Sequence, residues 1–312
     1  MPALEASAPG KLVLAGEYAV LAGAPSLVAA VDRFAIARLA PPVSRDAAAW
    51  HFQGLGFAVS SRHTLESILD ASVPLDPNDP ARYVRALTPN AIDPGRLPEN
   101  LDVTLDTRGF FDASTAASGA ASPPVKLGIG SSAAVLVAFA QALAAWTALD
   151  AVGLDTLHAA HHALQGGVGS GVDIAAAYHG GVLRFQDGTA NRVEMAPEVH
   201  FSFVFTGTST STADMILRFD AWRQKGEVEP LENRKTCALQ VANCTEKHNR
   251  FLAQMAEYIR ALEALDNAAG IGIFGPGHRR AMTLAAKVPV LYKPCGAGAV
   301  SYTHLTLPTS FL

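Results

Sequence analysis

Cysteine is scarce in this sequence of 312 residues. The three cysteines, Cys237, Cys244 and Cys295, show neither a paired pattern nor the spacing of a zinc site. We therefore expect no disulfide framework and a reducing, cytoplasmic compartment. Residues 1–7 include Glu5 and have none of the apolar core of a secretory signal peptide, which agrees with that location.

Strong net charge and long hydrophobic runs are also absent. The formal net charge is −4, and no basic stripe interrupts the sequence, so we expect no nucleic-acid partner. An anionic substrate would need a local cationic pocket. The most apolar stretch, residues 133–146, is too short to cross a bilayer, which predicts a buried core helix and no membrane partner.

What remains is the composition of an ordinary globular protein, with 49% hydrophobic residues and enough length for two domains. The patterns predict an α+β fold with a domain boundary near residue 190. Residues 11–20 read as a strand, a turn and a second strand. Further strands are expected at 26–37, 101–106, 182–185, 200–205 and 288–293. Helices are expected at 61–71, 80–87, 154–165, 172–179 and from 213, with a long helical periodicity over 237–264.

A glycine- and serine-containing run precedes the core helix. It reads Lys126-Leu127-Gly128-Ile129-Gly130-Ser131-Ser132. Glycines let the backbone turn tightly and approach a ligand, and the first amides of a helix attract an anion. The run therefore predicts a phosphate site, with an ordinary loop-to-helix turn as the alternative. The sequence contains no Walker-type run, and this run lacks the third glycine of a dinucleotide fingerprint.

Three further clusters each permit a functional and a structural interpretation. Lys11, after Pro9-Gly10 and before Gly16-Glu17-Tyr18, would lie beside an anionic substrate or on an edge strand. Asp173, after the Gly169-Ser170-Gly171 loop, would orient a substrate hydroxyl or simply favour a helix N-terminus. The run 293–299, Lys-Pro-Cys-Gly-Ala-Gly-Ala, would bring backbone amides to a substrate or form a plain turn.

Two other groups are interpreted structurally. His158, His161 and His162 have helical spacing, but no carboxylate shares their face, so we expect a solvated helix face rather than a metal site. Cys237 and Cys244 lie two helical turns apart and are expected to be buried helix residues.

Taken in order, Pro9-Gly10-Lys11, the run 128–134 and the run 295–298 resemble the three motifs of the GHMP kinase superfamily. The resemblance covers residues 6–299. It implies a GHMP kinase fold with a ribosomal protein S5 domain 2-like N-terminal domain over residues 1–190. A ferredoxin-like C-terminal domain is implied over 191–299, and ATP would bind between the two.

The resemblance also implies roles for single residues. Ser132 would help to hold Mg²⁺, Asp173 would be the catalytic aspartate, and Lys11 would lie near the accepting oxygen. ATP-binding residues would be Lys126, Gly128, Ile129, Gly130, Ser131 and Ser132. Substrate-binding residues would be Lys11, Tyr18, Ser170, Ser211, Gly296 and Gly298, and the segment 209–212 would lie near the phosphorylated substrate.

Within the superfamily, the sequence most resembles bacterial phosphomevalonate kinases, through residues 11–20, 126–134 and 205–215. This implies ATP-dependent phosphorylation of 5-phosphomevalonate, with ATP and Mg²⁺ as cofactors, by a monomer or homodimer. The alternatives are a mevalonate kinase, a sugar kinase, or a non-catalytic relative that binds ligand and regulates a partner. Mevalonate kinases carry a metal-binding glutamate where this chain has no acid, near His162, which disfavours that alternative.

The end of the sequence departs from the family pattern. The third motif should continue into Gly-Asp and a closing strand, but residues 300–309 resemble a translated adaptor used in DNA library preparation. A genuine polar tail is the alternative. We therefore expect residues 300–312 to be non-native and the C-terminal domain to be incomplete.

Overall fold

The computed structural model describes residues 2–42, 48–56, 59–88, 92–112, 125–167, 169–205, 212–226, 229–296 and 301–306. The chain divides into two compact units. The first unit comprises Met1–Lys11, Ala30–Ala113 and Ile129–Gly180, and the second comprises Leu12–Ala29, Ser114–Gly128 and Gly181–Leu312. Among the described residues, no helix has both the length and the apolar character needed to cross a membrane.

The sheet of the first unit is formed around β5 (Leu101–Asp106). Its side chains alternate between buried and half-buried, as the sequence pattern predicts for a strand with one covered face. It pairs in parallel with β3 (Trp50–Leu55) and antiparallel with residues 36–40 of β2 (Ser26–Ala40). The short β4 (Ser61–His63) pairs with β3.

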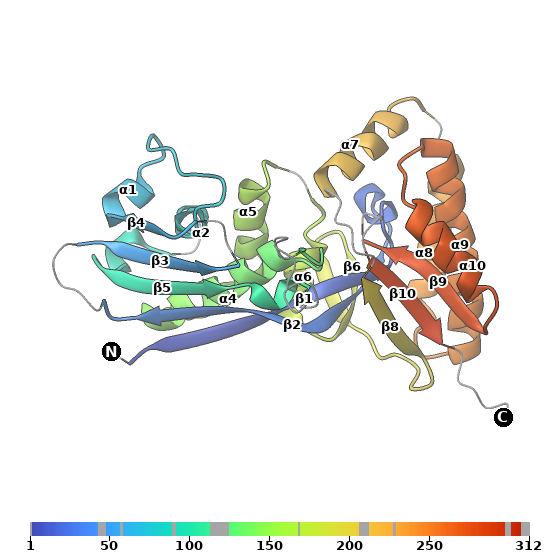
Figure 1. The fold of residues 1–312 in the computed structure, drawn as a ribbon, viewed down its shortest axis with the longest axis horizontal. Coiled ribbons are helices and arrows are strands. Elements are labelled where there is room, and N and C mark those ends of the chain that lie inside the picture. The colour runs from blue at the N-terminus through green and yellow to red at the C-terminus, as the bar shows by residue number, and fades with distance from the viewer. Residues whose placement is uncertain are drawn as a thin grey trace, which may run out of the picture. The chain divides into compact units, whose positions relative to one another are not determined.

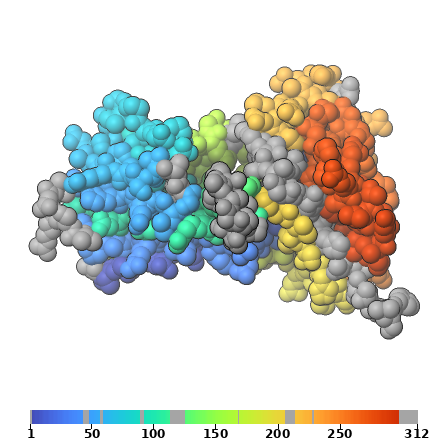
Figure 2. All heavy atoms as spheres, in the orientation of Figure 1, coloured from blue at the N-terminus to red at the C-terminus, as the bar shows by residue number. Residues whose placement is uncertain are grey.

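Helices cover this sheet. Short helices at α1 (Leu65–Leu69) and α2 (Ala81–Leu87) follow β4. Atoms of residues 50–88, blue to cyan, form much of the first unit's surface on the face seen in Figure 2. Three longer helices follow the glycine-serine run: α4 (Ser131–Trp146), α5 (Leu154–Leu164) and α6 (Val172–His179). Most side chains of α4 are buried, so the predicted core helix is confirmed.

The second unit begins with the end of β1 (Leu4–Ala15) and the first residues of β2. Residues 26–29 of β2 pair antiparallel with β6 (Val182–Gln186), which forms a hairpin with β7 (Thr189–Arg192). The Ser26 hydroxyl donates a hydrogen bond of 2.8 Å to the Ala15 carbonyl, which ties β2 to the end of β1.

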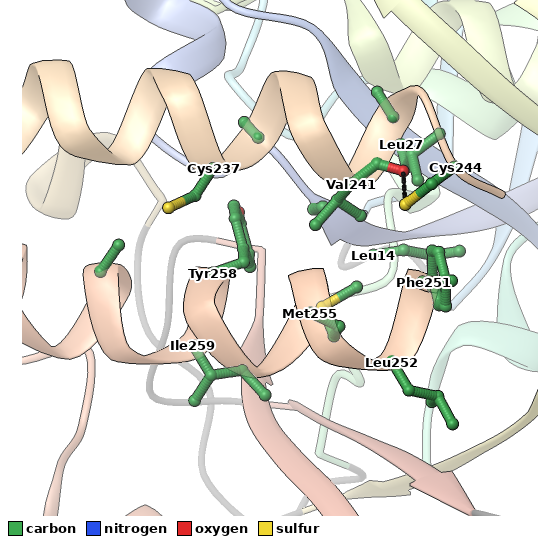
Figure 3. Packing of buried hydrophobic residues seen from close by; sticks show 14 of the residues in the cluster. Leu14, Leu27, Cys237, Val241, Cys244, Phe251, Leu252, Met255, Tyr258 and Ile259 are labelled. Atoms are coloured by element: carbon green, nitrogen blue, oxygen red, sulfur yellow. Dashed lines mark hydrogen bonds between the residues drawn. The ribbon is translucent and has the colours of Figure 1, made fainter. Parts of the chain in front are cut away.

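The helical part of this unit contains α7 (Thr212–Arg223), α8 (Glu229–Ala242), α9 (His248–Ala269) and α10 (Pro276–Ala285). Figure 3 shows side chains of α8 and α9 pointing toward one another, with Cys237 and Val241 facing Tyr258 and Met255. Leu14 and Leu27 of β1 and β2 complete this hydrophobic cluster. Both cysteines are buried, as expected, but Cys244 follows the end of α8 rather than lying within it.

A second sheet consists of β8 (His200–Phe205), β9 (Val290–Cys295) and β10 (Ser301–Thr306). The strand β10 lies between the other two and pairs antiparallel with both (Figure 1). Residues 301–306, within the segment that we expect to be non-native, form this middle strand. Their alternating Ser-Tyr-Thr-His-Leu-Thr sequence, rich in β-branched and aromatic residues, suits a strand.

Two sequence expectations are wrong. Residues after Gly16 do not form a second strand but a short 3-10 helix, η1 (Ala19–Ala22), preceded by Tyr18 with φ of 63°. The periodicity over 237–264 belongs to two helices, because residues 243–247 form a turn between α8 and α9. The other predicted strands and helices occur close to the expected residues, except that 61–71 divides into β4 and α1.

Candidate functional site

The glycine-serine run packs directly against Lys11 of β1. The Lys11 amide donates a hydrogen bond of 2.8 Å to the Ile129 carbonyl. Gly130 precedes α4 with φ of 82°, and a Cβ atom placed there would lie 3.0 Å from Lys11 Cγ. Glycine at this position therefore allows both the left-handed turn and the close approach of the lysine stem.

Lys11 and Asp173 form an ion pair. The Nζ–Oδ1 distance is 3.0 Å, and the exposed fractions of the two side chains are 13% and 28%. Asp173 lies in the first turn of α6, directly after the glycine loop. The structure therefore brings together two predicted site residues, the cation Lys11 and the anion Asp173. They meet near the N-termini of α4 and α6.

Ser132, in the first turn of α4, contacts a histidine of α5. Its Oγ lies 3.3 Å from His161 Nε2. His161 is 4% exposed, so the expectation that all three histidines form a solvated face is wrong for this residue. Burial lowers the pKa of His161, and nearby His158, Lys11 and His162 lower it further, whereas Asp173 opposes the shift.

A pocket of about 280 Å³ opens beside this contact. It is lined by His158, Ala159, His161, His162, Gln165 and the glycine loop at residues 169–171. His158 Nε2 lies 2.9 Å from the Gly171 carbonyl oxygen, which ties α5 to the loop that begins α6. Burial lowers the pKa of His158, so its imidazole favours the neutral form.

The remaining predicted site residues of this region differ in their exposure to solvent. Lys126 is exposed, whereas Ile129 and Ser131 are buried. Ser170 lines the pocket, and its Oγ accepts a hydrogen bond of 3.4 Å from the Val172 amide.

Tyr18 and Gly296 belong to the second unit. Tyr18 is only 4% exposed and packs against Phe219, at 5.2 Å between ring centroids. Burial raises the pKa of its phenol. Gly296 directly follows β9. Ser211, Gly298 and most of the segment 209–212 lie outside the described residues.

A buried charge cluster in the second unit was not predicted. The Glu17 carboxylate forms ion pairs with Arg234, at 3.0 Å, and with Lys293. Tyr258 donates its phenolic hydrogen to the same carboxylate, and the Arg234 guanidinium lies 3.3 Å from the centroid of its ring. Glu17 follows β1 and Lys293 lies in β9, so these ion pairs tie the end of β1 to β9 within the second unit.

The first unit offers only some of the ligands that a divalent cation needs. Mg²⁺ in proteins is commonly held by one or two carboxylates together with substrate phosphates. Ser132 Oγ and the Asp173 carboxylate are suitable oxygen ligands, but Asp173 already pairs with Lys11. Within the described ranges, no three His, Cys, Asp or Glu side chains gather into a cage for a metal. The residues therefore suit a cation that arrives with a phosphorylated ligand.

Comparison with known proteins is consistent with this arrangement. Residues 109–181 match the family described as "GHMP kinases N terminal domain". This segment contains the glycine-serine run, the pocket and Asp173, and the resemblance inferred from the three motifs is confirmed. No curated protein matches the chain by sequence.

Solved structures share the fold across almost the whole chain. A Lin0012 protein from Listeria innocua has a TM-score of 0.79 and 20% identity, with 99% of this chain and 91% of that chain covered. Streptococcus pneumoniae phosphomevalonate kinase, in complex with phosphomevalonate and AMPPNP, has a TM-score of 0.76 and 18% identity, with coverage of 99% and 93%. Methanococcus jannaschii mevalonate kinase has a TM-score of 0.71 and 14% identity, with coverage of 97% and 90%.

Proposed function

Because this chain is a member of the GHMP kinase superfamily, we propose that it transfers the γ-phosphoryl group of ATP to 5-phosphomevalonate. The observation that carries the proposal is the Lys11–Asp173 ion pair beside the loop that begins α4. A cation and a carboxylate held together at two helix N-termini suit the positioning of two phosphorylated ligands.

Different residues of the site would have different roles in phosphoryl transfer. Backbone amides of residues 128–132 would bind the nucleotide phosphates, aided by the positive end of the α4 dipole. Lys11 would lie against the accepting oxygen and neutralise the charge that develops there. Bound Mg²⁺ would neutralise charge on the transferred phosphoryl group, with Ser132 as a protein ligand.

Asp173 would orient rather than deprotonate the acceptor. The second pKa of a phosphate monoester is about 6, so the acceptor is largely ionised near neutral pH and hardly needs a base. The ion pair with Lys11 fits this role, because it fixes the direction of the ammonium group. An alcohol acceptor would instead require proton removal, for which the same carboxylate is suitable.

The acceptor is the point to test. Release of ADP should be measured by a coupled assay with purified full-length chain, ATP and Mg²⁺, in parallel with phosphomevalonate, mevalonate and galactose. We expect kcat/KM to be at least about a hundredfold higher with phosphomevalonate, because a site built for a charged group rejects analogues that leave its polar groups unpaired.

Two other outcomes correspond to the alternatives. Preference for mevalonate or galactose would assign the chain to another reaction of the superfamily. The absence of a carboxylate at His162 disfavours mevalonate as the acceptor. Binding of nucleotide without turnover of any acceptor would indicate a regulatory relative, against which the retained Lys11–Asp173 pair argues.

A further inference from the structure

His161 joins two helices at the predicted phosphate site. Its Nε2 lies 3.3 Å from Oγ of Ser132, which precedes it by 29 residues. Serine in a first helical turn commonly bonds to nearby backbone of its own helix. Here the hydroxyl has a partner on α5, at the wall of the pocket.

The direction of this hydrogen bond determines whether the Ser132 oxygen can bind a cation. A serine hydroxyl has one proton and two acceptor lone pairs, and it rotates to suit its neighbours. If the proton points into the site, it repels a cation there. If the proton is held by an acceptor behind it, both lone pairs remain for a ligand.

We propose that His161 is a positioning residue, whose Nε2 accepts the Ser132 proton and thereby turns the serine oxygen toward a nucleotide-bound cation. This inference rests on the proposed function, because it assumes that the run 128–132 binds a nucleotide. His161 acts through Ser132 and touches neither the acceptor nor the transferred group.

The orientation of the Ser132 hydroxyl matters for cation binding because the nearby carboxylate is already paired. Asp173 lies nearby, but its carboxylate is shared with Lys11 at 3.0 Å. The Ser132 oxygen therefore supplies a larger share of the protein's affinity for the cation than it would beside a free carboxylate. Loss of a group that orients a metal ligand typically weakens metal affinity by about tenfold to a hundredfold.

The test is direct binding, measured by isothermal titration calorimetry of the full chain with Mg·AMPPNP. For His161→Ala we expect the dissociation constant to rise by about tenfold or more. His161→Gln should restore most of the affinity, because its terminal amide reaches the place of Nε2. His161→Asn, with the same amide on a shorter stem, should not.

A matched control and a double variant separate positioning from packing. His200→Ala removes an exposed imidazole of β8, outside the pocket, and we expect less than a twofold change. In a Ser132→Ala background, His161→Ala should cause no further loss, since interacting residues behave non-additively. Circular dichroism should show that each variant remains folded.

The outcomes also distinguish this inference from the proposed function. If wild type phosphorylates phosphomevalonate but His161→Ala binds Mg·AMPPNP like wild type, the inference is overturned and the function stands. An equal loss in both backgrounds would likewise overturn it. If no acceptor is phosphorylated but binding depends on His161 through Ser132, the inference stands and the function fails.

Discussion

Glu17 and Arg234 form a buried ion pair, with 3.0 Å between the carboxylate Oε2 and the guanidinium Nη2. The exposed fractions of the side chains are 2% and 0%. Lys293 contacts the other carboxylate oxygen and also donates to the Val13 and Pro294 carbonyls. One carboxylate thus compensates two cations that water does not reach.

Removal of that carboxylate should strongly destabilise the second unit. Glu17→Ala leaves Arg234 and Lys293 buried without their counter-ion, and loss of one partner of a buried pair costs about 3–5 kcal/mol. Urea denaturation should reveal this loss. Glu232→Ala removes the exposed partner of Lys235 and should cost less than about 1 kcal/mol. Equal effects would contradict the importance of burial.

Asp173→Asn keeps the shape of the side chain but removes the charge that pairs with Lys11. We expect kcat to fall by about a hundredfold, because Lys11 loses the partner that holds its ammonium group in place. Steady-state kinetics with phosphomevalonate would measure it. Asp155→Asn, on the exposed surface of α5, serves as the control and should retain wild-type kcat. Wild-type turnover by Asp173→Asn would remove this residue from the reaction.

Gly130→Ala should impair both stability and turnover. An alanine at φ of 82° costs about 1–2 kcal/mol, and its Cβ would lie 3.0 Å from Lys11 Cγ. The lysine must then shift, so we expect kcat/KM to fall by at least about tenfold.

Gly188→Ala is a control matched for backbone strain. Gly188 has φ of 78°, and an added Cβ meets no atom within 4 Å. This variant should lose similar stability, measured by denaturation, but retain full kcat/KM. A comparable loss of activity in both variants would show that the effect comes from reduced stability alone.

His278 should make stability depend on pH. Burial, followed by the charge of Lys293, lowers the pKa of His278 to about 4, whereas Asp266 opposes the shift. In the unfolded chain the pKa is about 6.5, so the unfolded state binds a proton first as pH falls. The free energy of unfolding should therefore decrease by up to about 3 kcal/mol between about pH 6.5 and pH 4.

His278→Gln should reduce that decrease, since the variant has no imidazole to protonate. Urea denaturation across this pH range measures the slope. His200→Gln changes an exposed histidine of β8 and should keep the wild-type slope. A wild-type slope in His278→Gln would assign the pH dependence to other groups.

Local sequence patterns predicted the elements that depend on local chemistry. The apolar run in α4 and the alternation in β5 each identify their element, because burial repeats with the helix or strand period. The turn between α8 and α9 was not predicted, because residues 243–247 contain neither glycine nor proline.

Long-range contacts could not be predicted in this way. Glu17 meets Arg234 across 217 positions, and nothing in a single sequence pairs them. His161 lies beside Ser132 because α5 packs on α4, although helical spacing alone placed it on an outer face. The Lys11–Asp173 pair was expected near one site only through the family resemblance, and its 3.0 Å contact is new information from the structure.

The placement of β10 between β8 and β9 has a consequence for biosynthesis. During synthesis on the ribosome, β8 and β9 lack their common pairing strand until residues 301–306 have been made. Until then their unpaired backbone groups are available to other chains. Chaperones that cover exposed strand edges would protect the chain during this interval.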